Sequence, residues 1–407
     1  MNYKVAVDGG NSGIKVVVEG VLEMLLPNIN ASSTVDYRLN DAYSTSRNKG
    51  KDLLHVQITK NFDKGHKGTK TTIFGAMAEK MQGDKENRQS TNKCNDERLI
   101  ENIIISVAYS IIALKMENKE KLSPEMTFNV DLSTGLPYQE WSEELNGEKK
   151  FDIFRNNLLG NHRVSFLSPY FKELGVENIE VVIKHVDVGV EGSAALNAIR
   201  AFAEDDIDEM TDEDLIEKAV IVADIGAFTT EFIGAQWVQV SGDDEELECE
   251  LKVFPHISKG IDEGVGLTMD KAIEKIKIEC DDLRDNLIRR DIERAYTTPA
   301  GKKKGQVGWI PGKDINVNQW VYPMMDTLGD SIARKFYGFY NTRSIRKNII
   351  RIYICGGGSQ FEILANKFKE TLVNDGYSAD MIVTVSMPSP IYANCYGYYA
   401  ELVDDEE

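Results

Sequence analysis

The chain has 407 residues, of which 42% are hydrophobic, enough for two domains with buried cores. Its 47 basic and 66 acidic residues give a net charge of −19, and such an acidic surface repels nucleic acid. The five cysteines are scattered without a CxxC pair, which disfavours a disulfide framework and a zinc site. No apolar run approaches the roughly 20 residues that span a bilayer, and the N-terminus begins on a predicted strand instead of a signal peptide. These features predict a cytoplasmic protein.

The first predicted element is a β-hairpin over residues 5–18, with a turn made of small residues. Two apolar runs flank the segment from Asp8 to Gly13, a pattern that indicates two strands joined by a tight turn. Glycine lets the backbone approach a ligand closely, and successive N–H groups in such a turn form a concavity that binds anions. The carboxylate of Asp8 repels phosphate, so its expected partner is a divalent cation or the water around that cation.

Residues 30–186 are predicted to form a mixture of strands and helices. The polar stretch 30–70 contains a strand at 53–58, and the pattern at 71–78 indicates a strand that leads into a helix. The apolar run 99–116 contains neither Gly nor Pro, which predicts a buried helix. The remaining elements are a strand at 127–132 that ends in a turn at Gly135 and Pro137, helical pieces at 151–159 and 169–174, and a strand at 179–186.

A second hairpin repeats the first one 216 residues later along the chain. In a gap-free alignment Asp224, Gly226 and Thr229 fall on the Asp, the first turn Gly and the last turn Gly of the first hairpin. A single Asp-x-Gly hairpin is most often a structural turn, whereas two that align indicate a shared function. The pair predicts two hairpins, one from each domain, that bind one phosphate chain between them.

Two further glycine-containing segments follow the second hairpin. Gly260 and Gly264 precede a long charged helix expected at 267–295, and their spacing predicts a loop against a nucleotide sugar or base. The triplet Gly356 to Gly358 ends a strand at 352–355. A loop that needs positive φ explains such a triplet equally well, so the triplet carries weight only as the third member of a set. The other elements expected here are a turn-rich region at 297–313, a helix at 318–340, a helix at 361–373 and a strand at 381–385.

The two hairpins and the late Gly triplet, in this order, resemble the two phosphate motifs and the adenosine motif of the actin-like ATPase superfamily. Within it the chain looks most like the ParM-type, plasmid-segregating bacterial actins, and the resemblance spans nearly the whole chain. It implies an α/β, duplicated actin-like (ribonuclease H-like) ATPase fold, with two domains around a nucleotide cleft, each with a smaller inserted subdomain. The implied divisions are domain I at 1–190 with an insertion at about 30–95, domain II at 191–382 with an insertion at about 267–320, and a return to domain I with an acidic tail at 383–407.

The resemblance also implies roles for individual residues. Asp8 and Asp224 would hold Mg²⁺ through its waters and take part in catalysis, and Glu191 would position the attacking water. An alternative for Glu191 is an acid favoured by the N-terminal end of a helix dipole, and one for Lys15 is an exposed strand lysine. The turn at Ala227 departs from the commoner family pattern. The nucleotide-binding set implied is Gly10, Asn11, Ser12, Gly13, Lys15, Gly226, Ala227, Phe228, Thr229, Gly260, Gly264, Gly356, Gly357 and Gly358.

The function implied is that of a filament-forming ATPase, dependent on Mg²⁺ and on ATP or GTP, that drives plasmid DNA segregation. Its partners would be further copies of itself and a DNA-binding adapter on a plasmid centromere, because the acidic chain is not expected to contact nucleic acid directly. No contact with a membrane is expected, since neither terminus has a basic amphipathic helix. The alternative is a soluble phosphotransferase, such as a sugar or acetate kinase, built on the same fold.

Overall fold

The computed structural model describes residues 2–32, 53–62, 68–81, 85–87, 92–202, 210–241, 247–284, 287–386 and 389–404. The chain forms two compact units. Unit 1 comprises Met1–Ala194 and Asn394–Glu407, and unit 2 comprises Ala195–Ala393. Much of the expected insertion at 30–95 and the end of the acidic tail lie outside the described residues. The finer division into inserted subdomains stays a prediction.

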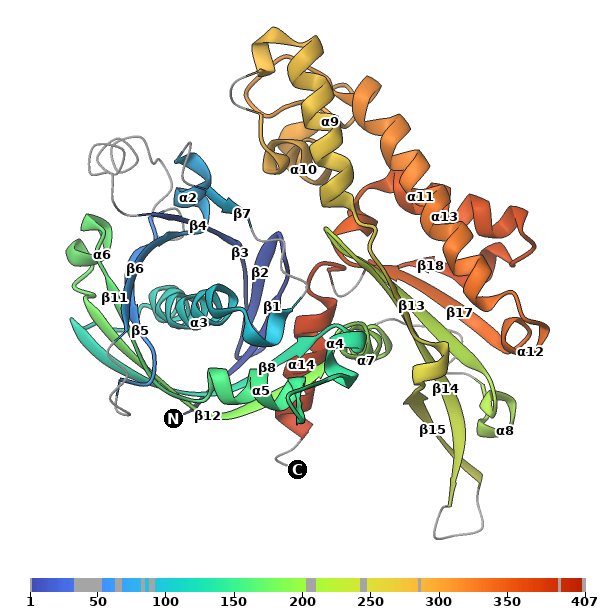
Figure 1. Ribbon diagram of the computed structural model, residues 1–407, viewed down its shortest axis with the longest axis horizontal. Coiled ribbons are helices and arrows are strands. Elements are labelled where there is room, and N and C mark those ends of the chain that lie inside the picture. The colour runs from blue at the N-terminus through green and yellow to red at the C-terminus, as the bar shows by residue number, and fades with distance from the viewer. Residues whose placement is uncertain are drawn as a thin grey trace. The chain divides into compact units, whose positions relative to one another are not determined.

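Within the described residues, unit 1 is built on a ten-stranded sheet that curves around one long helix (Figure 1). The strands are β1 (Asn2–Gly9), β2 (Gly13–Val18), β3 (Leu22–Pro27), β4 (Ile29–Ser32), β5 (His55–Thr59), β6 (Thr69–Phe74), β7 (Lys85–Asn87), β8 (Glu125–Leu136), β11 (Gly160–Phe166) and β12 (Asn178–Val190). Their order is β3-β2-β1-β8-β12-β11-β5-β6-β4-β7. β1 pairs antiparallel with β2 and parallel with β8, so the first predicted hairpin lies inside the sheet.

The helix inside this sheet is α3 (Glu97–Glu117), which corresponds to the buried helix predicted at 99–116. Its apolar side chains pack against the sheet in the main core of unit 1. Asp96 caps its N-terminus, since its carboxylate accepts a hydrogen bond from the backbone N–H of Leu99 at 3.0 Å. Among the described residues α3 is long and apolar enough to cross a membrane, but 83% of its most apolar window is buried in the protein. The expectation that no apolar run approaches this length was therefore wrong, and burial identifies α3 as a core helix.

Shorter elements flank the sheet of unit 1, and the C-terminal helix α14 (Ala393–Asp404) returns the chain to this unit. Helix α7 (Ser193–Phe202) follows β12 and carries the chain into unit 2. The others in unit 1 are α2 (Ala76–Lys80), the 3₁₀ helix η2 (Lys93–Asn95), α4 (Tyr138–Ser142), β9 (Glu144–Leu145), β10 (Glu148–Lys149), α5 (Lys150–Leu158) and α6 (Pro169–Glu173).

Unit 2 contains a second sheet, whose described strands run in the order β15-β14-β13-β17-β18, with β16 paired to β14. They are β13 (Ala219–Ile225), β14 (Thr230–Ser241), β15 (Leu247–Val253), β16 (Lys259–Ile261), β17 (Ile349–Cys355) and β18 (Ile382–Thr384). β13 pairs antiparallel with β14 and parallel with β17, so the second hairpin is confirmed and the Gly triplet follows the neighbouring strand.

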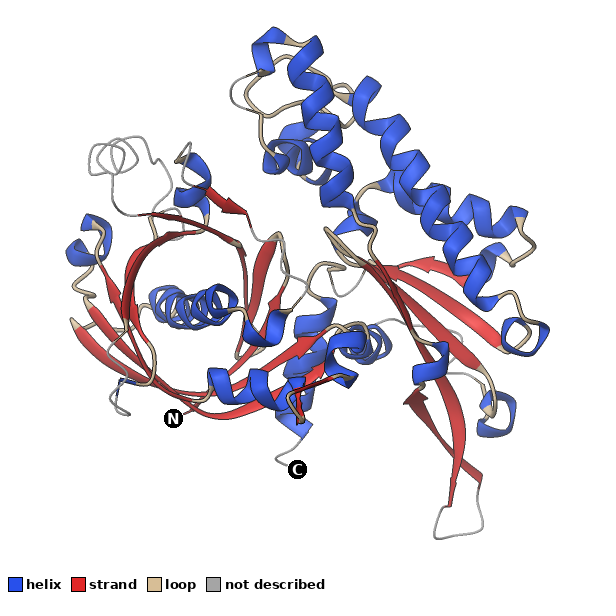
Figure 2. Cartoon of the chain, in the orientation of Figure 1, coloured by secondary structure: helices blue, strands red, loops and turns tan. Residues whose placement is uncertain are grey.

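Long helices of unit 2 pack together beside this sheet, with α11 against both α9 and α13 (Figure 2). Phe336 of α11 makes edge-to-face contacts with Phe232 of β14 and Phe368 of α13, at ring-centroid distances of 5.4 and 5.8 Å. The helices are α8 (Asp212–Leu215), η4 (Pro255–Ile257), α9 (Val265–Glu279), η5 (Asp281–Leu283), α10 (Arg289–Thr297), η6 (Pro299–Gly301), α11 (Asn318–Tyr340), α12 (Arg343–Arg346), η7 (Gly357–Gln360), α13 (Glu362–Asn374) and η8 (Ala379–Met381).

The single long helix predicted at 267–295 is wrong. Helix α9 ends at Glu279, the 3₁₀ turn Asp281–Leu283 follows, and α10 begins only at Arg289. Asp side chains compete for backbone hydrogen bonds and favour turns and helix starts. The carboxylate of Asp291 illustrates this, because it accepts a hydrogen bond from the backbone N–H of Ile288 at 3.1 Å and so caps α10.

Candidate functional site

The two hairpins have the same strand register. In unit 1, Asp8 of β1 lies opposite Lys15 of β2. In unit 2, Asp224 of β13 lies opposite Glu231 of β14. Each Asp comes just before the turn, and the turn residues have the spacing that the gap-free alignment predicts. The backbone pairing is therefore equivalent, while the residue opposite the Asp is basic in unit 1 and acidic in unit 2.

In both turns the backbone of the first residue lies close to the carbonyl oxygen of the fourth residue. A Cβ atom at Gly10 would lie 2.8 Å from the carbonyl oxygen of Gly13, and one at Gly226 would lie 3.0 Å from that of Thr229. Gly226 N–H donates to the same Thr229 oxygen at 2.9 Å. Such tight turns leave room for glycine and little else at the first turn position. The tip of the first turn is formed by Asn11 and Ser12, of which Ser12 is exposed.

Asp8 and Lys15 form an ion pair at the end of the first hairpin. Lys15 Nζ donates to Asp8 Oδ2 at 2.6 Å, and the two side chains are only 17% and 5% exposed. The alternative that Lys15 is an exposed strand lysine is therefore wrong. A carboxylate and an ammonium group beside a Gly-rich turn offer one ligand for a hydrated cation and one point charge for a phosphate oxygen.

Glu191 directly follows β12, and its carboxylate pairs with Lys93 of η2. Both side chains are largely buried, at 12% and 7% exposure. The backbone N–H of Glu191 donates to the carbonyl of Leu136 at 2.9 Å, and that of Gly192 donates to Oδ1 of Asn394 at 2.8 Å. Glu191 is thus held through its side chain and through the backbone on both sides of its Cα.

Lys93 is itself placed by a short helix that two hydrogen bonds anchor. The backbone N–H of Cys94 donates to Oε1 of Glu140 at 2.7 Å, and the Cys94 carbonyl accepts from Nδ2 of Asn157 at 3.0 Å. Burial, followed by the negative charge of Glu140, raises the pKa of the Cys94 thiol to about 11. These contacts tie η2 to α4 and α5, so the ammonium group of Lys93 is presented from a fixed backbone.

Tyr398 of α14 packs against the sheet of unit 1. Its ring is fully buried against β8, where a Cβ atom at Gly135 would lie 1.8 Å from the Tyr398 hydroxyl. Gly135 is therefore a strand residue required by close packing and does not belong to the turn predicted there. Burial, and then the charges of Glu191 and Asp8, raise the pKa of the Tyr398 phenol far above its usual value. The charges of Glu191 and Asp8 thus both act on one buried hydroxyl.

In unit 2 the second turn is held by the start of α9. The carbonyl of Gly226 accepts from the backbone N–H of Val265 at 3.1 Å, and that of Ala227 accepts from Gly266 at 2.6 Å. A Cβ atom at Gly264 would lie 2.5 Å from the Ala227 backbone, so glycine is required there by packing within unit 2. Contact of Gly264 with a nucleotide stays a prediction.

Gly260 and Phe228 also contact other residues of unit 2. A Cβ atom at Gly260 would lie 2.8 Å from a carboxylate oxygen of Glu231. The guanidinium of Arg289 lies over the Phe228 ring, 4.9 Å from its centroid, and Arg289 is also paired with Asp270. The half-buried ring of Phe228 therefore has one face occupied by unit 2 itself.

The glycines of the late triplet differ in their surroundings. Gly356 has φ +80°, and a Cβ atom there would lie 2.2 Å from a carboxylate oxygen of Asp224. A Cβ atom at Gly358 would lie 2.4 Å from the Ile225 side chain. Around Gly357, in contrast, no described residue outside its own stretch of chain has a heavy atom within 4 Å of the Cβ position. Packing against the second hairpin explains two of the glycines, and Gly357 has space beside it for a ligand.

The predicted site residues fall into two groups, one in each unit. Lys93 and Tyr398 join the unit 1 group, although no motif identifies a role for either. Lys93 pairs with a residue 98 positions away, and nothing in its polar surroundings signals that contact. Tyr398 lies in the predicted return to domain I, where an aromatic residue gives no sign that the charge of a distant carboxylate acts on it.

No family model matches the chain, and no curated protein matches it. Solved structures do match it over its full length. A 15-stranded ParM filament from Clostridium botulinum has 19% identity and a TM-score of 0.66, covering 99% of this chain and 100% of its own. The actin-like protein Alp7A has 16% identity and a TM-score of 0.67, covering 100% and 98%. The chain has an actin-like fold.

ParM from Bacillus thuringiensis with ADP is similar as well, at 17% identity and a TM-score of 0.61, covering 100% of this chain and 99% of its own. At these identities the likeness is one of fold. The predicted fold class and the resemblance to ParM-type actin-like proteins are confirmed at that level, and the actin-like scaffold accounts for two units that each carry a similar hairpin.

Proposed function

We propose that this chain is a nucleotide-dependent, filament-forming actin-like ATPase that drives plasmid DNA segregation through a DNA-binding adapter. The observation that carries the proposal is the repeated turn, in which an Asp at a strand end precedes a loop whose backbone approaches itself closely. Actin-like structures of similar length support it, since one is a ParM filament and another is a ParM with ADP.

The two turns would bind the phosphates of ATP or GTP through backbone N–H groups, and Lys15 would contact a β- or γ-phosphate oxygen. Asp8 and Asp224 fit Mg²⁺, because this ion keeps several waters and is bound through one or two carboxylates plus substrate phosphates. When bound, Mg²⁺ neutralises charge on the transferred phosphoryl group. Asp8 is 4% exposed and lies against a cation, Lys15, and this pairing supports a charged partner at its carboxylate.

Glu191 would orient the attacking water, with Lys93 holding its carboxylate in place. A preorganised carboxylate needs no reorganisation at the moment when the water is aligned.

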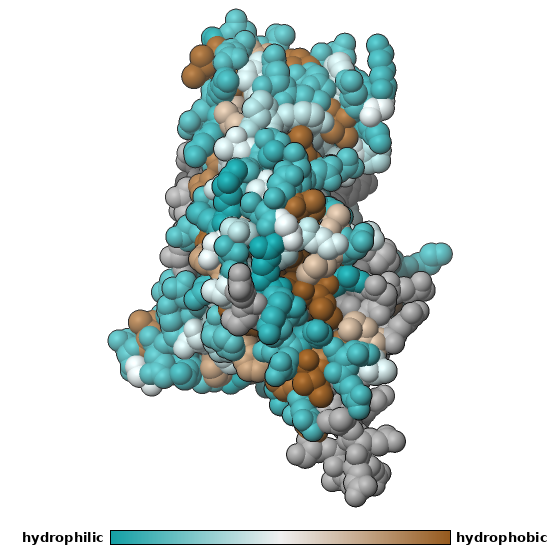
Figure 3. Space-filling view, turned by 90° about the vertical axis from the view of Figure 1, so that its right-hand side faces the viewer, coloured by the Kyte–Doolittle hydropathy of each residue, from teal (hydrophilic) through white to brown (hydrophobic). Residues whose placement is uncertain are grey.

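The proposed partners follow from charge and surface. With a net charge of −19, the chain would reach DNA through a basic adapter protein. The face drawn in Figure 3 is largely hydrophilic with scattered apolar residues, and among the described residues Val21 and Ile278 are the most exposed large hydrophobic ones, at 73% and 77%. We place the protein in the cytoplasm and assign it no membrane contact. A phosphotransferase of the same fold would instead stay a small oligomer.

The first test is nucleotide binding, measured by titration of a fluorescent ATP analogue with and without Mg²⁺. Asp8→Ala and Asp224→Ala should each lose the part of the affinity that depends on Mg²⁺, and Asp224→Ala should also abolish hydrolysis in a folded protein. Asp131→Ala is the matched control, because Asp131 lies on the sheet of unit 1 and its carboxylate accepts a hydrogen bond from Asn2 at the surface. Unchanged Mg²⁺ dependence in both site variants would remove these carboxylates from the mechanism.

A further inference from the structure

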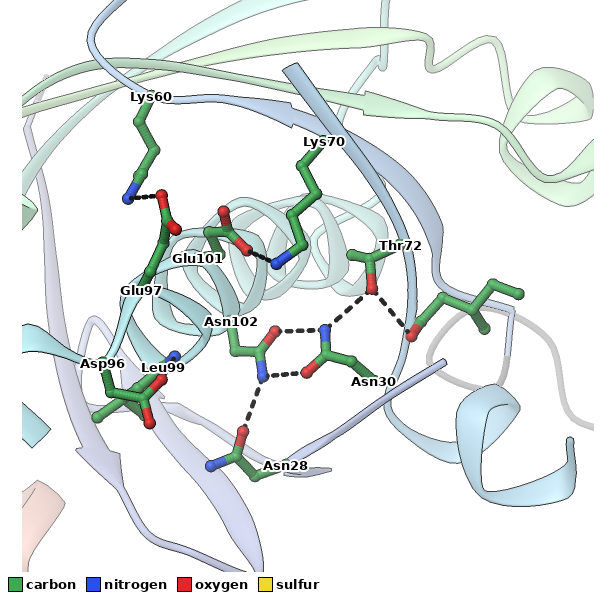
Figure 4. Close-up of polar contacts among 11 residues, drawn as sticks. Asn28, Asn30, Lys60, Lys70, Thr72, Asp96, Glu97, Leu99, Glu101 and Asn102 are labelled. Carbon is green, nitrogen blue, oxygen red and sulfur yellow. Dashed lines mark hydrogen bonds and ion pairs between the residues drawn. The ribbon is translucent and has the colours of Figure 1, made fainter. Parts of the chain in front are cut away.

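A series of hydrogen bonds between buried side-chain amides connects the first turn with helix α3. Figure 4 shows the part of this series that runs from Asn28 through Asn102 and Asn30 to Thr72. Asn28, which follows β3, donates from Nδ2 to the carbonyl oxygen of Gly10 at 2.9 Å. Its backbone N–H also donates to the carbonyl of Ser12 at 3.2 Å. On its other side, Asn28 Oδ1 accepts from Nδ2 of Asn102 on α3 at 2.8 Å. Two carbonyls of the turn are therefore tied to one asparagine, which is tied to the core helix.

The series of hydrogen bonds continues beyond α3 to strands β4 and β6. Asn102 Nδ2 also donates to Asn30 Oδ1 at 2.8 Å, and Asn30 Nδ2 donates both to Asn102 Oδ1 at 2.9 Å and to Thr72 Oγ1 at 3.0 Å. Asn28, Asn30, Thr72 and Asn102 are all at most 6% exposed. Buried amides that are fully hydrogen-bonded rigidify their surroundings, whereas breaking one bond leaves its partner unsatisfied.

In this series of hydrogen bonds, the partners of each amide fix which side donates and which side accepts. Asn28 must present its NH₂ group to the Gly10 carbonyl, so its Oδ1 faces α3. Asn102 must then donate to Asn28, which leaves its own Oδ1 to accept from Asn30. A carboxylate at position 102 has nearly the same shape but cannot donate, and would face two acceptors.

The second turn is held at the equivalent carbonyl. Gly226, which aligns with Gly10, has its carbonyl bound by the backbone N–H of Val265 at 3.1 Å. In a planar trans peptide the C=O and the following N–H point in opposite directions. Because the Gly10 carbonyl is held on the α3 side, the N–H of Asn11 points to the opposite side. The hydrogen bond to the Gly226 carbonyl orients the N–H of Ala227 in the same way.

We propose that Asn102 is a positioning residue for anion binding by the first turn, acting through Asn28 on the Gly10 carbonyl and so on the Asn11 N–H. The proposal rests on the proposed function, because it takes the anion to be a nucleotide phosphate. It assigns a role to a polar residue in the middle of an apolar helix. Asn102, Ser106 and Ser110 share one face of α3 by spacing. The Ser106 hydroxyl, however, donates within the helix, to the Asn102 carbonyl at 2.6 Å.

The test compares Asn102→Asp with the control Ser106→Ala, using hydrogen exchange and titration with Mg·ADP. In Asn102→Asp, amide exchange in a peptide covering residues 9–13 should become faster, while exchange in a peptide covering 225–230 should not change. Affinity for Mg·ADP should fall about tenfold, which corresponds to ~1.4 kcal/mol, and kcat at saturating nucleotide should change little. Ser106→Ala should behave like the parent chain in every measurement.

Asn28→Ala removes the last link without placing a charge in the core, and serves if Asn102→Asp does not fold. It should speed amide exchange at 9–13 in the same way. Adding Asn102→Asp to the Asn28→Ala variant should not weaken the binding of Mg·ADP any further. Unchanged exchange at 9–13 in the folded variants overturns the proposal. If the parent chain binds no nucleotide, the proposed function fails. The exchange measurement still tests the hydrogen-bonded link from Asn102 to the first turn: faster exchange confined to 9–13 in the variants supports this link, and unchanged exchange overturns it.

Discussion

At the scale of single residues, the role proposed for Glu191 is tested by comparing the rate of hydrolysis with nucleotide affinity. If it orients water, Glu191→Gln removes an interaction made in the transition state and leaves ground-state binding intact. We expect hydrolysis to slow about 100-fold, the lower range for groups that handle protons in catalysis, with nucleotide affinity nearly unchanged. Phosphate release under saturating nucleotide measures the rate. A variant that loses affinity and hydrolyses at the parental rate would show a structural role.

Lys93→Met should slow hydrolysis as well, because Glu191 then lacks the cation that holds its carboxylate. If the pair acts as a unit, Lys93→Met in the Glu191→Gln background should add little, and Lys93→Arg should recover part of the rate. Lys115→Met is a matched control, since Lys115 pairs with Glu120 at a partly exposed end of α3. Rate losses that add in full across the double variant would contradict the coupling.

The late Gly triplet allows binding and stability to be separated within adjacent residues. Gly356→Ala should lower the free energy of unfolding by about 1–3 kcal/mol, because φ is positive there and a Cβ atom would collide with Asp224. Gly357→Leu should leave the melting temperature unchanged and weaken nucleotide binding, since the space beside Gly357 is open within the described residues. Thermal melts and nucleotide titrations of both variants check this. Equal destabilisation by both changes would show that the triplet is purely structural.

The residues that a motif carries could be predicted, and those that act across the fold could not. Asp8, Gly10 and their counterparts stand out because a turn restricts residue type locally. The pairing of Lys93 with Glu191 depends on how η2 packs beside the end of β12, which no local pattern encodes. Asn102 did leave a signal, as an amide inside an apolar run, but its partners lie on other elements.

At the scale of elements, strands and helices with a strong period could be predicted from the sequence. The two hairpins, α3 and the long helix α11 lie where periodicity and apolar runs indicated. The break between α9 and α10 was missed because the segment contains no Gly or Pro, and the Asp-rich turn was taken as helical charge. The curvature of the unit 1 sheet around α3 follows from pairings between distant strands, which sequence periodicity does not specify.

Cysteines report on how tightly three of these elements pack. Cys94 of η2, Cys355 of β17 and Cys395 of α14 are fully buried, whereas Cys280 after α9 is half-buried. Burial raises the pKa of Cys94 to about 11, so at pH 8 only about one thiol in a thousand is the reactive thiolate. Native alkylation should therefore modify Cys280 well before Cys94, and the Cys94 rate should rise with pH toward 11. Peptide mass mapping measures both rates, and equal rates at pH 8 would contradict the packing.

At the scale of the whole molecule, the net charge of the chain would oppose the assembly that we propose. Each copy carries a net charge of −19, so association brings like charges together and depends on screening by salt and Mg²⁺. In the proposed function each copy would repeat one head-to-tail contact, and such a contact gives an open helical filament when its rotation does not close into a ring. Nucleotide binding would favour the conformation that makes this contact, and hydrolysis would release it.

Sedimentation with a non-hydrolysable ATP or GTP analogue and Mg²⁺, over a series of protein concentrations at physiological salt, tests the central claim most directly. We predict that pelletable polymer appears above a critical concentration and is absent without nucleotide, and that negative-stain images of the pellet show filaments. Asp224→Ala should not pellet under the same conditions. Absence of polymer at concentrations on the order of tens of micromolar, where weak protein association is populated, would contradict the filament function and favour a phosphotransferase.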